Sequence, residues 1–123
     1  MYDHIGLRVR DLGASVRFYE AALASLGYVL GPHDGASAGF GPPDEPALWL
    51  YGTGDAAGAD AHVAFRAATH EAVDRFHAAG LAAGGHNNGT PGMRPDYGPA
   101  YYAAFLTDPD GNNVEAVCLG EAG

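Results

Sequence analysis

The chain contains an internal repeat, which is revealed by shifting the sequence along itself by 58 positions. The shift aligns His4 with His62 within two strand-like runs. The same register aligns further pairs across those runs and across helix-like runs: Arg8 with Arg66, Ala14 with Ala72, Arg17 with Arg75, Phe18 with Phe76, Ala21 with Ala79, Leu23 with Leu81 and Gly27 with Gly85. A repeat in so short a chain predicts two copies of one supersecondary unit. The two histidines would then be related by pseudo-twofold symmetry and could face a shared cavity.

Composition limits the class of protein. A chain of 123 residues with 47% hydrophobic residues is long enough for one globular domain with its own core. The net charge of -9 disfavours a nucleic-acid partner, whose phosphates would be repelled. All six cationic residues are arginines, which excludes a Schiff-base lysine. The single cysteine, Cys118, and the lack of a signal segment or a long apolar run favour a cytoplasmic protein without membrane contact.

The first repeat reads as a strand, a helix and three further strands. Residues 3–10 alternate between apolar and polar, which is typical of a half-buried strand. Asp11 is the predicted N-cap of a helix of about 14 residues, and Gly27 is placed to end it. Short strands are expected at Tyr28–Gly31, at 36–41 and at Leu48–Tyr51.

The second repeat follows a small-residue connector, Gly52–Asp60, so that modules of 1–56 and 57–123 are expected. A strand at 61–66 precedes a helix that Thr69 caps and that ends near Gly80 or Gly84. A long loop is predicted from His86 to Pro99. Strands Tyr101–Thr107 and Asn112–Leu119 then flank the tight turn Asp108–Gly111. The pattern predicts an α+β fold of two βαβββ modules.

Glu115 is the only charged residue between Gly111 and Gly120. A carboxylate inside an apolar strand is costly unless it is paired or bound to a metal. His4 and His62 are its natural partners, since two imidazoles and one carboxylate can bind one side of a divalent ion. Such a set accepts Fe(II), Mn, Zn, Co or Ni. A structural network in which Arg8 or Arg66 pairs with Glu115 is the alternative, and His33, His70 and His77 are expected to be solvated.

The pattern resembles the vicinal oxygen chelate superfamily, which includes glyoxalase I, bleomycin-resistance proteins, fosfomycin-resistance enzymes and extradiol dioxygenases. His4 in DHIGLRVRDLGASVRFYEAAL, His62 in AHVAFRA and Glu115 in YYAAFLTDPDGNNVEAV carry the resemblance over nearly the whole chain. It implies paired modules whose sheets curl around a divalent metal, and a homodimer. The metal would act as a Lewis acid on a small oxygen-rich substrate, or bind dioxygen, in a lyase, isomerase or dioxygenase reaction.

The resemblance is incomplete at one position. Glyoxalase I commonly takes a fourth ligand from the last strand of its first module, and the corresponding segment here, Leu48–Tyr51, contains no carboxylate. The expected ligand set is therefore two histidines and one glutamate, as in the dioxygenase and fosfomycin-resistance branches. Trp49 and Tyr51 are expected to form an aromatic wall or part of the core.

Substrate specificity is expected in the loop His86–Pro99, because loops of this length are often functional. Arg94 could hold a carboxylate or phosphonate, and Tyr102 could donate a proton beside the metal. The alternatives are that Arg94 pairs with Asp96 and that the tyrosines belong to the core. The residues expected to contact substrate are Trp49, His86, Arg94, Tyr97 and Tyr101.

Two functions remain open from the sequence. The first is the metal-dependent enzyme built on His4, His62 and Glu115. The second is a metal-free protein of the bleomycin-resistance type that sequesters a planar ligand between Trp49 and the tyrosines. The intact set of three ligands favours the enzyme. Whether the modules pair within one chain or between two chains is left open.

Overall fold

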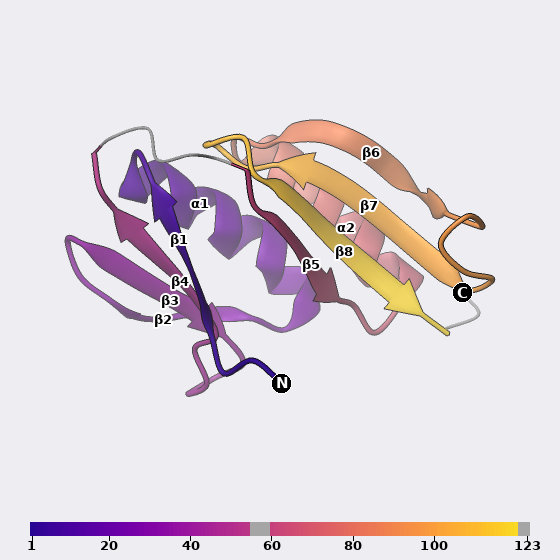
Figure 1. The fold of residues 1–123 in the computed structure, drawn as a ribbon, viewed down its shortest axis with the longest axis horizontal. Helices are drawn as coiled ribbons and strands as arrows, with labels where there is room; N and C mark the ends of the chain where they lie inside the picture. The colour runs from indigo at the N-terminus through magenta and orange to yellow at the C-terminus, as the bar shows by residue number, and fades with distance from the viewer. Residues whose placement is uncertain (55–59, 121–123) are drawn as a thin grey trace.

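The computed structural model describes residues 1–54 and 60–120, and its two halves repeat one order of elements (Figure 1). The first half contains β1 (Ile5–Val9), α1 (Leu12–Leu23), the 3-10 turn η1 (Ala24–Leu26), β2 (Val29–His33), β3 (Ser37–Gly41) and β4 (Leu48–Gly52). The second half contains β5 (His62–Arg66), α2 (His70–Ala82), β6 (His86–Met93), β7 (Tyr101–Thr107) and β8 (Asn113–Leu119). The predicted α+β fold of two βαβββ units is confirmed.

Each half forms its own four-stranded mixed sheet, with strand orders β1-β4-β3-β2 and β5-β8-β7-β6. In each sheet the first and last strands of the unit are parallel neighbours, and the other pairs are antiparallel. The predicted module boundary between residues 56 and 57 lies outside the described residues, as does part of the connector Gly52–Asp60. None of the helices in the described ranges is long and apolar enough to cross a membrane.

Local capping chemistry explains where the two helices begin. The Asp11 carboxylate accepts a hydrogen bond from the backbone N–H of Ala14 at 3.1 Å, and the Thr69 hydroxyl accepts one from Ala72 at 3.0 Å. Each bond satisfies a donor that has no partner within the helix. Gly27, at φ 84°, ends η1 in the left-handed conformation that glycine adopts without steric cost. The predicted caps are confirmed.

Both helices pack on the same side of the two sheets and against each other, so that the other side of each sheet is free of helices (Figure 1). Strand alternation sends Leu48 and Leu50 of β4, and Val114 and Ala116 of β8, into the core between sheets and helices. The intervening side chains lie on the open faces. This arrangement leaves two open sheet faces, one for each module.

Two sequence predictions are wrong in the second module. Residues 86–93, predicted as loop, form strand β6, which pairs with β7 through an irregular register. Backbone pairing with β7 overrides the low strand propensity of this glycine- and asparagine-rich segment, and Pro91 is tolerated because β6 is an edge strand. His77, expected to be solvated, is buried, and its Nε2 lies 2.9 Å from Oδ1 of Asn87.

The turn between β7 and β8 joins the two modules. Asp108, only 2% exposed, accepts hydrogen bonds from the Tyr19 hydroxyl at 2.6 Å and from the Asn112 backbone N–H and side-chain amide at 2.9 and 3.0 Å. Asp110 accepts from the backbone N–H of Arg10 at 2.9 Å. Burial and the neighbouring Asp108 carboxylate raise the pKa of Tyr19 well above its usual value. The turn therefore attaches the second sheet to the first module.

Candidate functional site

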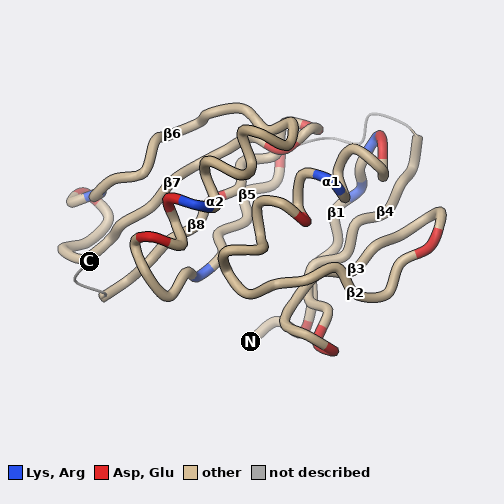
Figure 2. The backbone as a smooth tube through the Cα atoms, turned by 180° about the vertical axis from the view of Figure 1, so that it is seen from behind, with Lys and Arg blue, Asp and Glu red and all other residues tan. Residues whose placement is uncertain are grey.

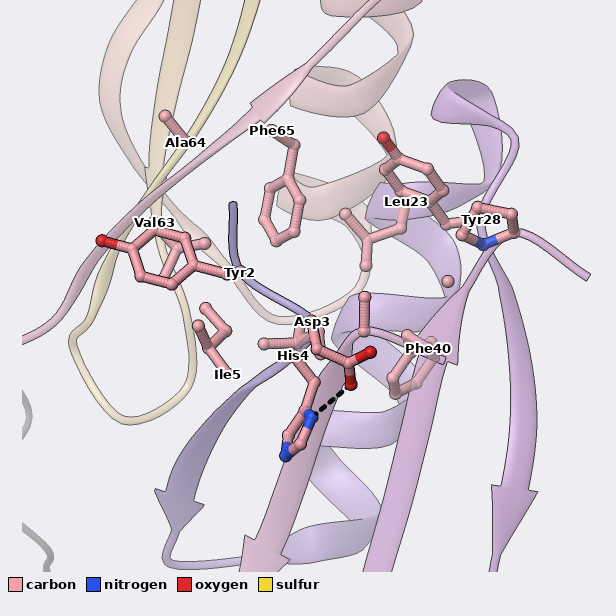
Figure 3. Close-up of a pocket in the computed structure, with 14 residues that line it drawn as sticks. Tyr2, Asp3, His4, Ile5, Leu23, Tyr28, Phe40, Val63, Ala64 and Phe65 are labelled. Carbon is pink, nitrogen blue, oxygen red and sulfur yellow. Dashed lines mark hydrogen bonds and ion pairs between the residues drawn. The ribbon is translucent and has the colours of Figure 1, made fainter. Parts of the chain in front are cut away.

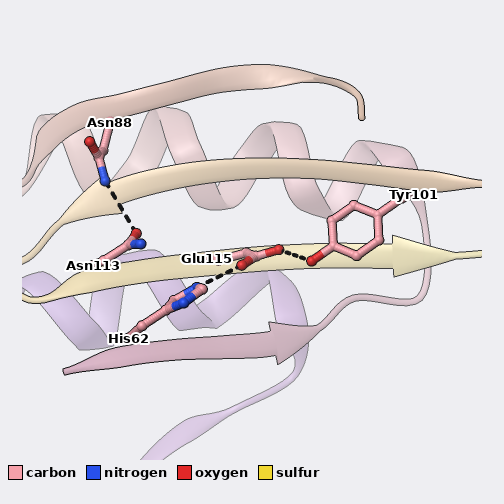
Figure 4. A network of polar contacts seen from close by, with 5 residues as sticks. All are labelled: His62, Asn88, Tyr101, Asn113 and Glu115. Atoms are coloured by element: carbon pink, nitrogen blue, oxygen red, sulfur yellow. Dashed lines mark hydrogen bonds and ion pairs between the residues drawn. The ribbon is translucent and has the colours of Figure 1, made fainter. Parts of the chain in front are cut away.

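Glu115 forms the centre of a polar cluster on the open face of the second sheet (Figure 4). The residue is 1% exposed, and its Oε1 lies 2.8 Å from Nε2 of His62 on β5. The hydroxyl of Tyr101, on β7, donates to Oε2. Both carboxylate oxygens therefore have partners, which is how a buried charge is tolerated in an apolar strand.

Strand pairing explains why these three side chains meet. Glu115 lies opposite Ala64 of β5 and Phe105 of β7. His62 is two residues before Ala64, and Tyr101 is four residues before Phe105, so both share the face of Glu115. The side chain of His62 is 54% exposed, which leaves the cluster accessible from solvent.

The Tyr101 hydroxyl retains its proton over a wide pH range. Partial burial and the hydrogen bond to Glu115 raise the pKa of Tyr101 to about 12. The phenol is therefore neutral at physiological pH and can act as a hydrogen-bond donor or proton donor. The cluster combines a carboxylate, an accessible imidazole and a phenol within one open sheet face.

Arg94 and Tyr97 lie beside this cluster. The Arg94 guanidinium lies over the ring of Phe105, with Cζ 5.5 Å from the ring centroid, and it donates to the carbonyl of Thr90 at 2.6 Å. Within residues 1–54 and 60–120, no salt bridge joins Arg94 to Asp96 or to another carboxylate. Tyr97 contacts Tyr101 edge to face at 5.2 Å. Arg94 therefore supplies a positive charge close to the cluster.

His86 lies further from Glu115. It opens β6 and pairs with Thr107, in the same transverse row as His62 but separated from β5 by β7 and β8. Asn113 occupies that row on β8 and accepts a hydrogen bond from Asn88 at 3.2 Å (Figure 4). The row extends the polar surface away from Glu115 towards the sheet edge.

His4 does not join Glu115 within the described part of the chain. It precedes β1 in the first sheet, and its Nδ1 lies 2.7 Å from Oδ1 of Asp3 (Figure 3). Across residues 1–54 and 60–120, no group of three histidine, cysteine or acidic side chains is arranged to hold a metal ion. Of the three predicted metal ligands, the described structure therefore brings together His62 and Glu115, but not His4.

The face of the first sheet presents aromatic rings where the second presents Glu115. Gly6 pairs with Trp49 as Ala64 pairs with Glu115, so Trp49 is the structural counterpart of Glu115. A Cβ at Gly39 would come within 3.0 Å of the Trp49 ring. A Cβ at Gly6 would come within 2.8 Å of the ring of Tyr51. The two rings thus lie over glycines, on a surface free of carboxylates at this position.

Tyr102, predicted as the proton donor, lies on the opposite face of β7 from Glu115. Its hydroxyl donates to Oδ1 of Asp74 on α2 at 2.6 Å, and its ring stacks on His70 at 3.9 Å. The hydrogen bond to Asp74 raises the pKa of Tyr102 to about 12. Adjacent strand residues point to opposite faces, so Tyr101 is the tyrosine that reaches Glu115. Counting strand residues outwards from the Asp108–Gly111 turn would have shown from the sequence that Tyr101, and not Tyr102, shares a face with Glu115.

Comparisons with known proteins agree on the family. Residues 2–116 match the Glyoxalase/Bleomycin resistance protein/Dioxygenase superfamily. The chain is similar to the crystal structure of a glyoxalase/bleomycin resistance protein from Albidiferax ferrireducens T118, with 30% identity, a TM-score of 0.83 and coverage of 97% of this chain and 98% of that one. It is also similar to a glyoxalase/dioxygenase from Nostoc punctiforme, with 25% identity, a TM-score of 0.72 and coverage of 98% and 92%. No curated protein matches the chain.

Proposed function

Because the chain belongs to the Glyoxalase/Bleomycin resistance protein/Dioxygenase superfamily, we propose that it is a metal-dependent enzyme acting on a small oxygen-rich molecule. One observation carries the proposal. Glu115, buried in an apolar strand, holds His62 and Tyr101 on an open face of the sheet. Buried carboxylates with accessible partners are uncommon unless they serve a site, since burying them is costly.

The donors present suit a divalent ion. Two ligand atoms bound to one ion at about 2.1 Å and at right angles would lie about 3.0 Å apart. The 2.8 Å between His62 Nε2 and Glu115 Oε1 is close to that separation. When bound, the ion would polarise substrate oxygens as a Lewis acid or bind dioxygen. His62 and Glu115 supply two of the three expected protein ligands, and the third must come from elsewhere.

We propose that a second copy of the chain supplies this donor through His4. The open face of the first sheet carries aromatic rings and no helix, and the open face of the second sheet carries the Glu115 cluster. A twofold dimer that places these faces together would form two equivalent sites. Each would combine His4 of one copy with His62 and Glu115 of the other.

The remaining residues would bind and orient the substrate. Arg94, which has no carboxylate partner among the described salt bridges, would hold an anionic group such as a carboxylate or phosphonate. The Tyr101 hydroxyl would hold a proton at Oε2 of Glu115 and present it to the substrate. A chelated oxygen-rich substrate of this type would suit a lyase, isomerase or ring-cleaving dioxygenase reaction.

Elemental analysis of purified protein tests the metal directly. We expect close to one divalent ion per chain after reconstitution, and loss of the ion in Glu115→Gln and His62→Ala. His33→Ala is the matched control, because His33 is exposed and contacts only the carbonyl of Gly31 among the hydrogen bonds described. Stoichiometric metal retained in both site variants would overturn the proposed centre.

Complementation tests the second copy. Neither His4→Ala nor Glu115→Gln should bind metal alone, but a mixed dimer contains one intact site. Random exchange of the two variants should restore roughly a quarter of the wild-type metal, since half of the dimers are mixed and each has one site of two. No recovery, with dimer exchange verified by native mass spectrometry, would exclude sharing between copies.

Sequestration of a ligand without metal is the second candidate function. The Trp49 and Tyr51 rings on the first sheet offer a flat aromatic surface, with Tyr51 43% exposed. A planar ligand could stack on that surface. Substoichiometric metal that reconstitution does not increase, together with ligand binding that Trp49→Ala abolishes, would favour this function over the enzyme.

A further inference from the structure

A cavity of about 270 Å³ lies where the two modules meet (Figure 3). Buried Leu23, Phe40 and Leu48 of the first module form part of its lining. Tyr28 and Phe65 also line it, with ring centroids 6.3 Å apart. The lining includes none of His62, Tyr101 and Glu115, but it does include His4, the donor proposed above for the metal centre of the partner copy, whose Nδ1 lies 2.7 Å from Oδ1 of Asp3.

The opening of this apolar cavity is acidic. Asp3 and Tyr2 line both the cavity and an adjoining groove, and that groove also contains Asp44 and Glu45. No arginine lines either space. Figure 2 shows the same distribution, with acidic segments in the loop between β3 and β4 beside the N-terminus. The protein as a whole carries a net charge of -9, which adds to the negative potential.

We propose that this cavity binds an amphipathic cation, a compact aromatic ring system that carries an ammonium or amidinium group. The ring would enter the apolar cavity, and the cation would remain at the opening near Asp3, Asp44 and Glu45. The ring of Tyr2, which lines both the cavity and the acidic groove, can also attract a cation.

The size of the cavity matches such a ligand. An apolar cavity of about 150 Å³ is large enough to bind benzene, so about 270 Å³ suits a two-ring system. An anion of the same shape would be repelled by the acidic opening, and a neutral analogue would gain only the apolar contact. The proposal therefore predicts an order of affinity that depends on charge alone.

Three probes with the same ring system separate these contributions: naphthylmethylammonium, naphthylmethanol and naphthoate. We expect saturable binding of the cation by ligand-observed NMR titration. The alcohol should bind more weakly, by up to about fivefold, since one solvent-exposed ion pair contributes up to about that factor. Naphthoate should bind least. The double substitution Asp44→Asn and Glu45→Gln should remove most of the preference for the cation while leaving the affinity for the alcohol unchanged.

A blocking variant tests the location. Ala47 is exposed and lines both spaces, so Ala47→Trp adds a ring at the opening without altering the buried lining. It should abolish binding of all three probes, whereas Glu115→Gln should leave their binding unchanged. Thermal unfolding verifies that each variant is folded. Equal affinity for the three probes, undiminished binding to Ala47→Trp, or absence of saturable binding would each overturn the proposal.

Discussion

Replacing Asp108 with alanine should weaken the attachment between the two modules. The Asp108 carboxylate is 2% exposed and accepts from the Tyr19 hydroxyl and from both the backbone and the side-chain amide of Asn112. It also accepts from the backbone N–H of Asp110 at 2.9 Å. Asp108→Ala removes every one of these acceptors at once, and a methyl group cannot replace them.

The size of this destabilisation depends on how many of the hydrogen-bond donors left without an acceptor are buried. Tyr19 and Asn112 are 0% and 3% exposed, so their donors cannot turn to water without a local rearrangement. A buried donor left without a partner costs about 1–3 kcal/mol, which for these groups gives a loss of roughly 3–5 kcal/mol in the free energy of unfolding. With an unfolding entropy of about 2.1 cal/mol/K per residue, that loss lowers Tm by roughly 12–19 °C.

Differential scanning calorimetry of wild type, Asp108→Ala and Asp34→Ala measures this effect. Asp34 is a matched control because its carboxylate also accepts turn hydrogen bonds, from Ala36 and Ser37 at 2.8 and 2.9 Å, but on an exposed surface. Water can replace those bonds, so Asp34→Ala should lower Tm far less. A Tm for Asp108→Ala as high as that of Asp34→Ala would refute the argument that burial makes this turn stabilising.

Three further predictions follow from the same contacts. The pKa of Tyr19 is higher in the folded protein than the value of about 10 in the unfolded chain, so its neutral form stabilises the fold below pH 10. This stabilisation is lost as pH rises from the unfolded pKa towards the higher folded pKa. In urea titrations from pH 8 to 11, the free energy of unfolding should therefore fall less steeply with pH in Tyr19→Phe than in wild type. Tyr101→Phe should reduce turnover of an identified substrate by about 10²-fold or more, as for loss of a general acid. Tyr102→Phe is the control, because Tyr102 lies on the other face of β7, and it should leave turnover nearly unchanged. Equal effects of the two substitutions would remove Tyr101 from the mechanism. Gly39→Val should displace the Trp49 ring, because even a Cβ at this position would come within 3.0 Å of it. A shift in tryptophan fluorescence without loss of the fold would report the displacement. Unchanged fluorescence would show that the ring does not lie over Gly39.

Local sequence patterns were sufficient for most of the fold. The N-caps at Asp11 and Thr69 and the glycine stop at Gly27 depend on hydrogen bonds and dihedral preferences within a few residues. Alternation along the strands identified their buried faces for the same reason. Segment 86–93 was misread because its strand character comes from pairing with β7, whereas its own residues favour turns.

Identifying the candidate site required both the sequence pattern and the pairing of the strands. A lone carboxylate within an apolar strand marked Glu115 from the sequence, and the repeat marked His62 beside it. Which tyrosine reaches Glu115 was a matter of strand parity, and the sequence prediction chose Tyr102 where the pairing of β7 with β8 presents Tyr101.

The sequence by itself determined that the chain is a duplicated βαβββ protein with an unusual buried glutamate, because those properties arise from neighbouring residues and from the repeat. Only the tertiary structure decided that His4 lies beside Asp3, just before the first strand of a different sheet from that of Glu115. It also decided that Asp108 joins the modules through Tyr19. Such relations involve residues far apart in the chain, and they depend on strand register and on how the two modules pack against each other through their helices.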